Sequence, residues 1–268
     1  MYGNLLDHPE ALNHYYRSHF GITPEETPES VVVTPLHFSG VIGTALPEAL
    51  EKRGARVRTL KTALSGFGDS FLAESKQASA LFAIGGVGGS LALGHALLLA
   101  HAPKTQRVLF YGTCGAVADH ARIYDLNVPD RCVRGDRVAE DVYPVDIPAA
   151  GDPALCIEMR RRLTDGLDGS DRAVQSDLHY TVSNIFVETT DMLERLRSDG
   201  VNTIDMELSV YYTVLGQAGK SVAGVVKTID LPLRGIPTYE GARNGVTPDD
   251  RSAVNEAILE AICGACGL

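Results

Sequence analysis

Residues 78–115 constrain the fold of this chain more than any other part of it. Residues 78–84 predict a buried strand, which a glycine-rich run ends, and residues 91–102 are strongly helical. Residues 107–111 predict a second strand, which a second glycine run ends. Strands that alternate with helices across glycine turns are typical of α/β proteins, so we expect a mixed central β-sheet flanked by helices.

The rest of the 268-residue chain extends this pattern without an apparent domain boundary. We therefore expect one domain over residues 1–268, with an N-terminal helical extension at about residues 1–29. Residues 165–177 are polar and predict a loop, and Asp191 with Glu194 resembles a capping box at the start of a helix. The remaining expected elements are helices at 5–20, 47–52, 192–197, 207–219 and 251–263, the last opened by Thr247-Pro248-Asp249-Asp250, and strands at 31–33 and 220–227.

Composition and charge exclude several classes of partner. The formal net charge of −10 and the pI of about 5.2 argue against a nucleic-acid polymer or an anionic membrane, because both require a basic surface. No apolar run reaches the length of a membrane span, and residues 1–10 lack the basic and apolar regions of a signal peptide. The five cysteines are odd in number and form no disulfide framework, which indicates a reducing cytoplasm.

Three further signals for reaction chemistry are weak. Cys263-x-x-Cys266 resembles a redox or metal pair, but it has no second pair and no nearby histidine, which favours two small residues in a last helical turn. Cys114 has no base assigned beside it, so a small buried residue is a better interpretation than a nucleophile. The eight histidines show no metal-ligand spacing, so we expect neither a metal nor another cofactor.

The glycine runs at 85–90 and 112–115 each follow an expected strand. The first fails the dinucleotide fingerprint because Leu91 stands at its last glycine position, and no Lys-Ser/Thr pair follows to form a phosphate loop. A turn of this kind either approaches a polar ligand closely or packs a strand tightly against a helix. Because ligands of open α/β sheets bind beyond the carboxyl ends of the strands, both turns point to one cleft.

Two carboxylates, Glu207 and Asp230, occupy positions that suit a reaction centre. Glu207 opens an expected helix, and Asp230 lies 23 residues later at the end of an apolar run. A helix start and a strand end can meet in one cleft, where one acid stays ionised and binds hydroxyls while the other carries a proton. The alternative is that the two side chains are unrelated caps.

Ordered segments of the chain resemble the nucleoside phosphorylase and nucleosidase family, which includes purine nucleoside phosphorylases, uridine phosphorylases and methylthioadenosine nucleosidases. Residues 85–98 and Tyr111-Gly112-Thr113-Cys114-Gly115-Ala116-Val117 resemble the family's glycine turn, helix and strand ending in G-[ST]-x-G. Ser183-Asn184-Ile185-Phe186 resembles the segment that supplies an aromatic ring, and Asp205-Met206-Glu207 resembles the ribose-binding motif. Asp230 has the spacing of the family's proton-donating aspartate, and the resemblance extends from about residue 31 to the C-terminus.

The resemblance implies an enzyme that cleaves the N-glycosidic bond of a small nucleoside, of purine type, as a homo-oligomer. Glu207 would hold the ribose hydroxyls, Met206 would pack against the sugar, and Phe186 would stack on the base. Asp230 would protonate the leaving purine at N7 with assistance from Arg243, since cleavage needs a neutralised leaving group. The other substrate-binding residues implied are Gly88, Thr113 and Gly115.

The chain departs from the phosphorolytic members of this family at both of their usual phosphate-binding arginines. His37 stands where the first arginine would fall, and Phe110 stands where the second would fall. Because bidentate arginine contacts are the usual phosphate clamp, water is favoured over phosphate as the co-substrate. His37 is either the group that activates this water or a structural residue. Ile229 replaces a serine that purine-specific members often have, which weakens the expectation of a purine edge.

Two alternatives to a hydrolytic nucleosidase stay open. The first is a phosphorylase whose phosphate site is rebuilt from other residues. The second is a nucleoside-binding protein that has lost catalysis, which the missing arginines favour and the retained acids oppose.

Overall fold

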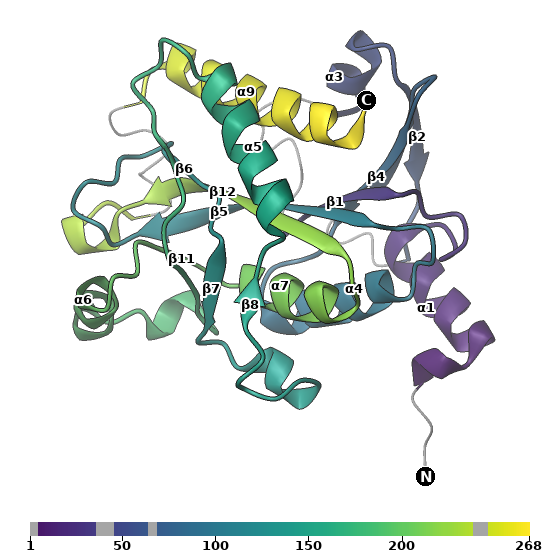
Figure 1. The fold of residues 1–268 in the computed structure, drawn as a ribbon, viewed down its shortest axis with the longest axis horizontal. Helices are drawn as coiled ribbons and strands as arrows, with labels where there is room; N and C mark the ends of the chain where they lie inside the picture. The colour runs from purple at the N-terminus through teal and green to yellow at the C-terminus, as the bar shows by residue number, and fades with distance from the viewer. Residues whose placement is uncertain (1–4, 36–45, 64–68, 238–245) are drawn as a thin grey trace.

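The structure, a computed structural model, describes residues 5–35, 46–63, 69–237 and 246–268. A β-sheet runs through the middle of the molecule, and helices cover both of its faces (Figure 1). The strands are β1 Ser30–Thr34, β2 Arg56–Leu60, β3 Ser70–Glu74, β4 Ser79–Ile84, β5 Arg107–Ala116, β6 Leu126–Asn127, β7 Arg131–Arg134, β8 Ala149–Ala150, β9 Val174–Gln175, β10 His179–Thr181, β11 Thr203–Asp205 and β12 Ser221–Asp230. The helices are α1 Pro9–Phe20, α3 Leu46–Lys52, α4 Gly89–Ala100, α5 Pro153–Gly166, α6 Thr190–Ser198, α7 Leu208–Gln217 and α9 Pro248–Cys266, with 3-10 turns η1 Leu5–Asp7, η3 Val138–Asp141, η4 Ile185–Val187 and η5 Pro232–Arg234.

The sheet is mixed, as the sequence predicts. Its strands follow the order β2-β3-β4-β1-β5-β11-β10-β7-β8, and β12 pairs with both β5 and β6. β1 is parallel to β4 and β5, and β12 is parallel to β5. The pairs β2 with β3, β3 with β4, and β11 with β5 are antiparallel.

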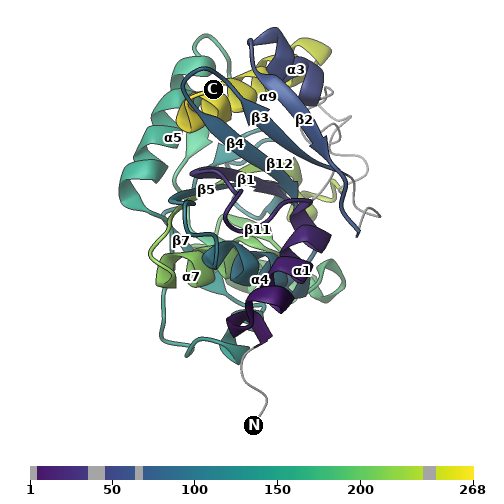
Figure 2. The same cartoon turned by 90° about the vertical axis from the view of Figure 1, so that its right-hand side faces the viewer.

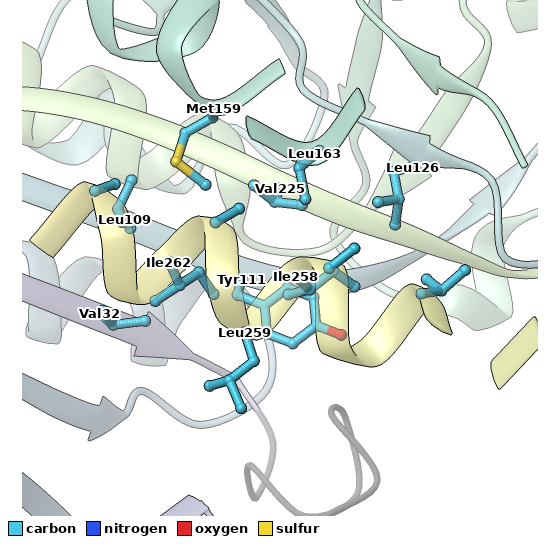
Figure 3. Close-up of a cluster of buried hydrophobic side chains, with 14 of the residues drawn as sticks. Val32, Leu109, Tyr111, Leu126, Met159, Leu163, Val225, Ile258, Leu259 and Ile262 are labelled. Carbon is cyan, nitrogen blue, oxygen red and sulfur yellow. The ribbon is translucent and has the colours of Figure 1, made fainter. Parts of the chain in front are cut away.

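The core lies in two layers, one on each side of the sheet. α5 packs with α9 over one face, and α4 packs with α7 over the other, with α1 against α4 (Figure 1, Figure 2). Successive side chains of β1 pack in opposite layers of the core. Val32 packs in the cluster beside α9 (Figure 3), whereas Val31 and Val33 pack in the cluster beside α7. Because side chains alternate along a strand, a strand covered on both faces reads as a continuous apolar run.

The C-terminal helix α9 begins and packs as expected. The Thr247 side chain accepts a hydrogen bond from the Asp250 amide, and Asp250 accepts one from the Thr247 amide, which forms a capping box. Cys263 and Cys266 are buried in this helix, and burial raises the pKa of each thiol to about 12. At neutral pH both thiols stay protonated. No helix in the described ranges is long and apolar enough to span a bilayer.

Three local expectations were wrong. Residues Gly112 to Gly115 are not a turn, because β5 continues through them to Ala116. The N-cap of α6 is Thr189, whose hydroxyl accepts from the Met192 amide, so Asp191 and Glu194 do not form its capping box. The stretch 165–177 contains the end of α5 and all of β9 rather than loop alone.

Candidate active site

A cavity of about 270 Å³ opens where the carboxyl ends of β5 and β12 meet the start of α7. This is the position at which α/β sheets bind ligands. We call it the substrate cavity, and its described lining residues are Pro35, Val87, Thr113, Cys114, Gly115, Ile185, Glu188, Ile204, Asp205, Met206, Glu207, Ile229 and Asp230.

Gly115 lies between the two halves of the substrate cavity. It pairs with Ile204 of β11 in an antiparallel ladder and with Asp230 of β12 in a parallel one. A Cβ atom at this position would lie 3.2 Å from Oδ2 of Asp230 and 3.2 Å from Cγ1 of Ile204. The absence of a side chain therefore lets the Asp230 carboxylate lie directly against the β5 backbone.

Glu207 is held by the turn that precedes α4. The Gly88 amide donates a hydrogen bond of 2.6 Å to Oε1 of Glu207. Gly88 is the N-cap residue of α4 and has a φ of 97°, a conformation open to glycine and strained for other residues. Glu207 is itself the N-cap residue of α7 and makes no side-chain cap there, so its carboxylate reaches across to α4.

The environment of Glu207 disfavours its negative charge. Burial raises the pKa of its carboxyl, and the neighbouring charge of Asp205 raises it further. The hydrogen bond from the Gly88 amide acts in the opposite direction, because it stabilises the ionised form. This carboxyl can therefore exchange a proton or form a hydrogen bond with a hydroxyl in either protonation state.

Asp205 stabilises the backbone that carries Glu207. Its carboxylate accepts hydrogen bonds from the Leu208 amide at 2.9 Å and from the Thr181 hydroxyl at 2.8 Å. Nε2 of His179 also lies 2.9 Å from Oδ1 of Asp205, at ion-pair distance without the alignment of a hydrogen bond. Asp205 thus caps α7 and fixes the backbone that carries Glu207.

Glu188 is a fourth acid of the substrate cavity, and sequence reasoning missed it. It follows η4, a turn that Asn184 begins by accepting a hydrogen bond from the Phe186 amide at 2.9 Å. Burial raises the pKa of Glu188 to about 7, and the charge of Asp230 contributes to the rise. In the sequence, an acid just before a helix reads as an ordinary helix-start residue, so no local signal pointed to it.

The described part of the cavity lining carries four carboxyl groups and no basic side chain. Glu207 and Asp205 lie on the side formed by β11 and α7, and Asp230 with Glu188 lies on the other side. An acidic site of this kind stabilises positive charge that develops on a bound molecule.

Comparisons with known proteins identify the family of this chain. A family model described as the Phosphorylase superfamily matches residues 83–240 of this chain. The chain belongs to the phosphorylase superfamily. This membership supports an enzyme, a nucleosidase or a nucleoside phosphorylase, that cleaves the glycosidic bond of a nucleoside.

Solved structures of phosphorylases and a nucleosidase share the fold at low sequence identity. Uridine phosphorylase from Vibrio fischeri is 17% identical, with a TM-score of 0.69 over 92% of this chain and 96% of that chain. Purine nucleoside phosphorylase from Toxoplasma gondii, in complex with immucillin-H, is 16% identical, with a TM-score of 0.71 over 92% and 94%. AMP nucleosidase from Bacteroides thetaiotaomicron is 17% identical, with a TM-score of 0.66 over 95% and 97%. No curated protein sequence matches the chain.

Several residues that the sequence predicts to bind substrate meet at the cavity, although not every one of them lines it. Met206, Glu207, Thr113, Gly115 and Asp230 are all lining residues. Of the other expected residues, Gly88 instead supports Glu207, Phe186 is a surface residue of η4 with 89% exposure, and His37 and Arg243 lie outside the described residues.

Phe186 lies next to the cavity without lining it. Its neighbour Ile185 is a lining residue, as is Glu188 two positions later. Stacking of Phe186 on a base requires its exposed side chain to turn toward the cavity, and this role stays a prediction.

Two further positions are clarified by the structure. Phe110 is 1% exposed and packs against the Tyr211 ring at 5.3 Å between centroids, so the place of the second expected arginine is occupied by core. Cys114 lines the cavity, but burial raises the pKa of its thiol well above the ordinary value. A protonated thiol is a poor nucleophile, which supports a packing role. No cluster of three His, Cys, Asp or Glu side chains suited to a metal occurs in the described ranges.

Proposed function

We propose that this chain hydrolyses the N-glycosidic bond of a purine-type nucleoside. The observation that carries the proposal is the placement of Glu207 and Asp230 in one cavity, on opposite sides of Gly115. A cavity with one carboxyl group at the sugar and another at the base suits a reaction in which the two ends need different chemistry.

In the proposed reaction the bond between C1′ of the ribose and the ring nitrogen of the base breaks. Asp230 gives its proton to the departing base, so that the electron pair of the broken bond stays on a neutral molecule. Glu207 holds the ribose hydroxyls, and the negative charge on that side stabilises the oxocarbenium-like sugar. The oxygen of water then bonds to C1′ and loses a proton, for which His37 remains the candidate base.

Glu188 extends the acidic wall beside Asp230. Because the pKa of Glu188 is raised to about 7, a large share of this side chain is neutral at physiological pH. A neutral carboxyl both donates and accepts hydrogen bonds, which suits contact with the edge of a purine. We therefore place Glu188 with Asp230 at the base end of the cavity.

The charge of the cavity favours water over phosphate. Four acids and no basic side chain are found among its described lining residues, so none of these residues offers a cationic contact to a phosphate dianion. The core position of Phe110 supports the same choice, because it leaves no arginine at the second expected phosphate contact. Phosphorolysis remains the competing reaction, with phosphate-binding groups supplied from elsewhere.

The test is release of free base from purine and pyrimidine nucleosides, with and without phosphate, in water enriched in ¹⁸O. Hydrolysis predicts equal release in both conditions and a free ribose that carries the label at C1′. Release that depends on phosphate, with a sugar 1-phosphate as product, would establish the phosphorylase instead. Tight nucleoside binding without release of base would identify the non-catalytic alternative.

A further inference from the structure

A second cavity has none of its described lining residues in common with the substrate cavity. Its volume is about 390 Å³. We call it the arginine cavity, and its principal walls are Arg122, Asp171, Arg172, Leu231, Arg234 and Ile236. These residues come from three separate segments: the connection after β5, the connection after α5, and the short hairpin that follows β12.

Each of the three guanidinium groups donates a hydrogen bond to a backbone carbonyl. Nη1 of Arg234 donates to the Ala121 carbonyl at 2.8 Å, and Arg122 donates to the Asp171 carbonyl. Arg172 donates to the Ile123 carbonyl at 3.0 Å. A guanidinium carries five N–H donors in a planar fork, so the contact with Ala121 orients Arg234 and leaves it further donors for a ligand.

Positive charge exceeds negative charge at Arg234. Among the described residues no carboxylate lies at ion-pair distance from the Arg234 side chain. Arg234 contacts Asp119 through the backbone carbonyl of that residue, whereas the Asp119 carboxylate pairs with Arg197. By contrast, Arg122 pairs with Asp125 and with Asp171, each at 3.5 Å. Arg172 pairs with Asp250 at 3.2 Å and with Asp171 at 3.4 Å, so the unbalanced charge of the cavity is that of Arg234. An uncompensated cation in a cavity attracts a small anion locally, even in a chain whose net charge is −10.

We propose that the arginine cavity binds a phosphate group, either as inorganic phosphate or as the monoester of a small organic molecule. Arginine forks match the oxygens of phosphate in a bidentate arrangement. The volume falls within the range of small-molecule sites, and Leu231 and Ile236 supply apolar wall for an organic part. This proposal is independent of the reaction assigned to the substrate cavity.

The site is mechanically connected to the candidate proton donor. Leu231 directly follows Asp230 and exchanges two backbone hydrogen bonds with Ile236, at 2.9 Å and 3.2 Å, which closes the hairpin. Arg234 ties this hairpin to the connection after β5. A phosphate bridging Arg234 and Arg122 would hold the two segments together, and it would thereby stabilise the strand end that carries Asp230.

The experiment is calorimetric titration of the full chain with inorganic phosphate and, separately, with a nucleoside 5′-monophosphate, alongside thermal unfolding. Arg234→Gln is expected to weaken binding about tenfold or more and to remove the phosphate-dependent rise in Tm, because a charge-assisted contact is lost. Arg161→Gln is the matched control, since Arg161 is 62% exposed and, within the described part of the chain, pairs only with Asp165 on α5. Nucleoside cleavage measured without phosphate should be unchanged in Arg234→Gln.

The arms of the experiment separate the outcomes. Binding of both ligands, or of only one of them, with loss in Arg234→Gln supports the site and identifies the source of the phosphate group. Equal phosphate affinity in the wild-type chain and in Arg234→Gln would overturn the proposal. The proposal would also be overturned if Glu207→Ala abolished phosphate binding while Arg234→Gln did not. If Arg234→Gln unfolds, Arg234→Lys keeps the charge without the fork, and an unweakened affinity in this variant would contradict bidentate recognition.

Discussion

Gly88 and Glu207 are joined by a hydrogen bond of 2.6 Å, although 119 positions separate them in the sequence. The contact links the start of α4 to the start of α7, two helices that also pack side by side. Gly88 therefore contributes to the site by orienting a carboxylate rather than by lining the cavity.

Gly88→Ala tests this positioning. Alanine is strained at a φ of 97°, so the backbone is expected to rotate and the amide to turn away from Glu207. We expect KM for the nucleoside to rise about tenfold, with a smaller effect on binding of the free base. Gly54→Ala is the matched control, since Gly54 also has a positive φ of 86° and open space around it. Equal losses of activity in the two variants would show that strain alone is responsible.

Asp230→Asn removes the proposed proton donor while keeping the size of the side chain. Turnover should fall by about two to four orders of magnitude, whereas nucleoside affinity stays within a few fold. Single-turnover kinetics and equilibrium binding separate these two effects. Asp119→Asn, at an acid whose side chain is 84% exposed, is the control and should leave both unchanged. Unchanged turnover in Asp230→Asn would remove this residue from the mechanism.

Gly115→Ala tests the close approach of Asp230 to β5. The new Cβ would lie 3.2 Å from the carboxylate, so Asp230 must shift by a few tenths of an ångström. We expect turnover to fall about tenfold and the free energy of unfolding to fall by about 1 kcal/mol. Gly94→Ala in α4 has nothing within 4 Å of its new Cβ and should stabilise the chain by about 0.5 to 1 kcal/mol without loss of turnover.

Glu188→Gln tests the raised pKa of that acid through stability. Because the pKa rises from 4.5 to about 7 on folding, the folded chain binds the extra proton between these values and loses stability as pH increases through them. Glutamine removes this loss, so relative to the wild-type chain the variant should gain about 1 kcal/mol between pH 4.5 and pH 8, a figure reduced for partial solvent screening. Chemical denaturation across this pH range measures the difference. Glu194→Gln, at an exposed position of α6, should show no such trend.

The buried part of the fold could be predicted because its signal is local. β1, β4 and β12 are covered on both faces and appear in the sequence as apolar runs. β2 escaped prediction because its residues are mostly exposed or half-buried and include Arg56 and Arg58. Its pairing with β3 depends on a partner distant in the sequence, which periodicity does not reveal.

The glycines of β5 show why the site was only partly predictable. Glycine usually ends a strand, so Gly112 and Gly115 predicted a turn. In the structure a Cβ at Gly112 would lie 2.7 Å from the Phe110 ring, and one at Gly115 would meet Asp230. The glycines are present because other groups approach the strand closely. Glu188 depends in the same way on tertiary structure, since only the η4 turn brings it to the cavity.

The double pairing of Gly115 has a consequence for how such sites can diversify. The separation between the β11 side and the β12 side of the cavity is set by two adjacent backbone ladders, each about 4.8 Å wide, and not by the side chains that line the cavity. Backbone hydrogen bonds do not depend on the identity of the side chains. Neighbouring residues can therefore be replaced without changing the separation between the two sides of the cavity. This independence offers a physical reason why chains with 16 to 17% identity can keep one fold.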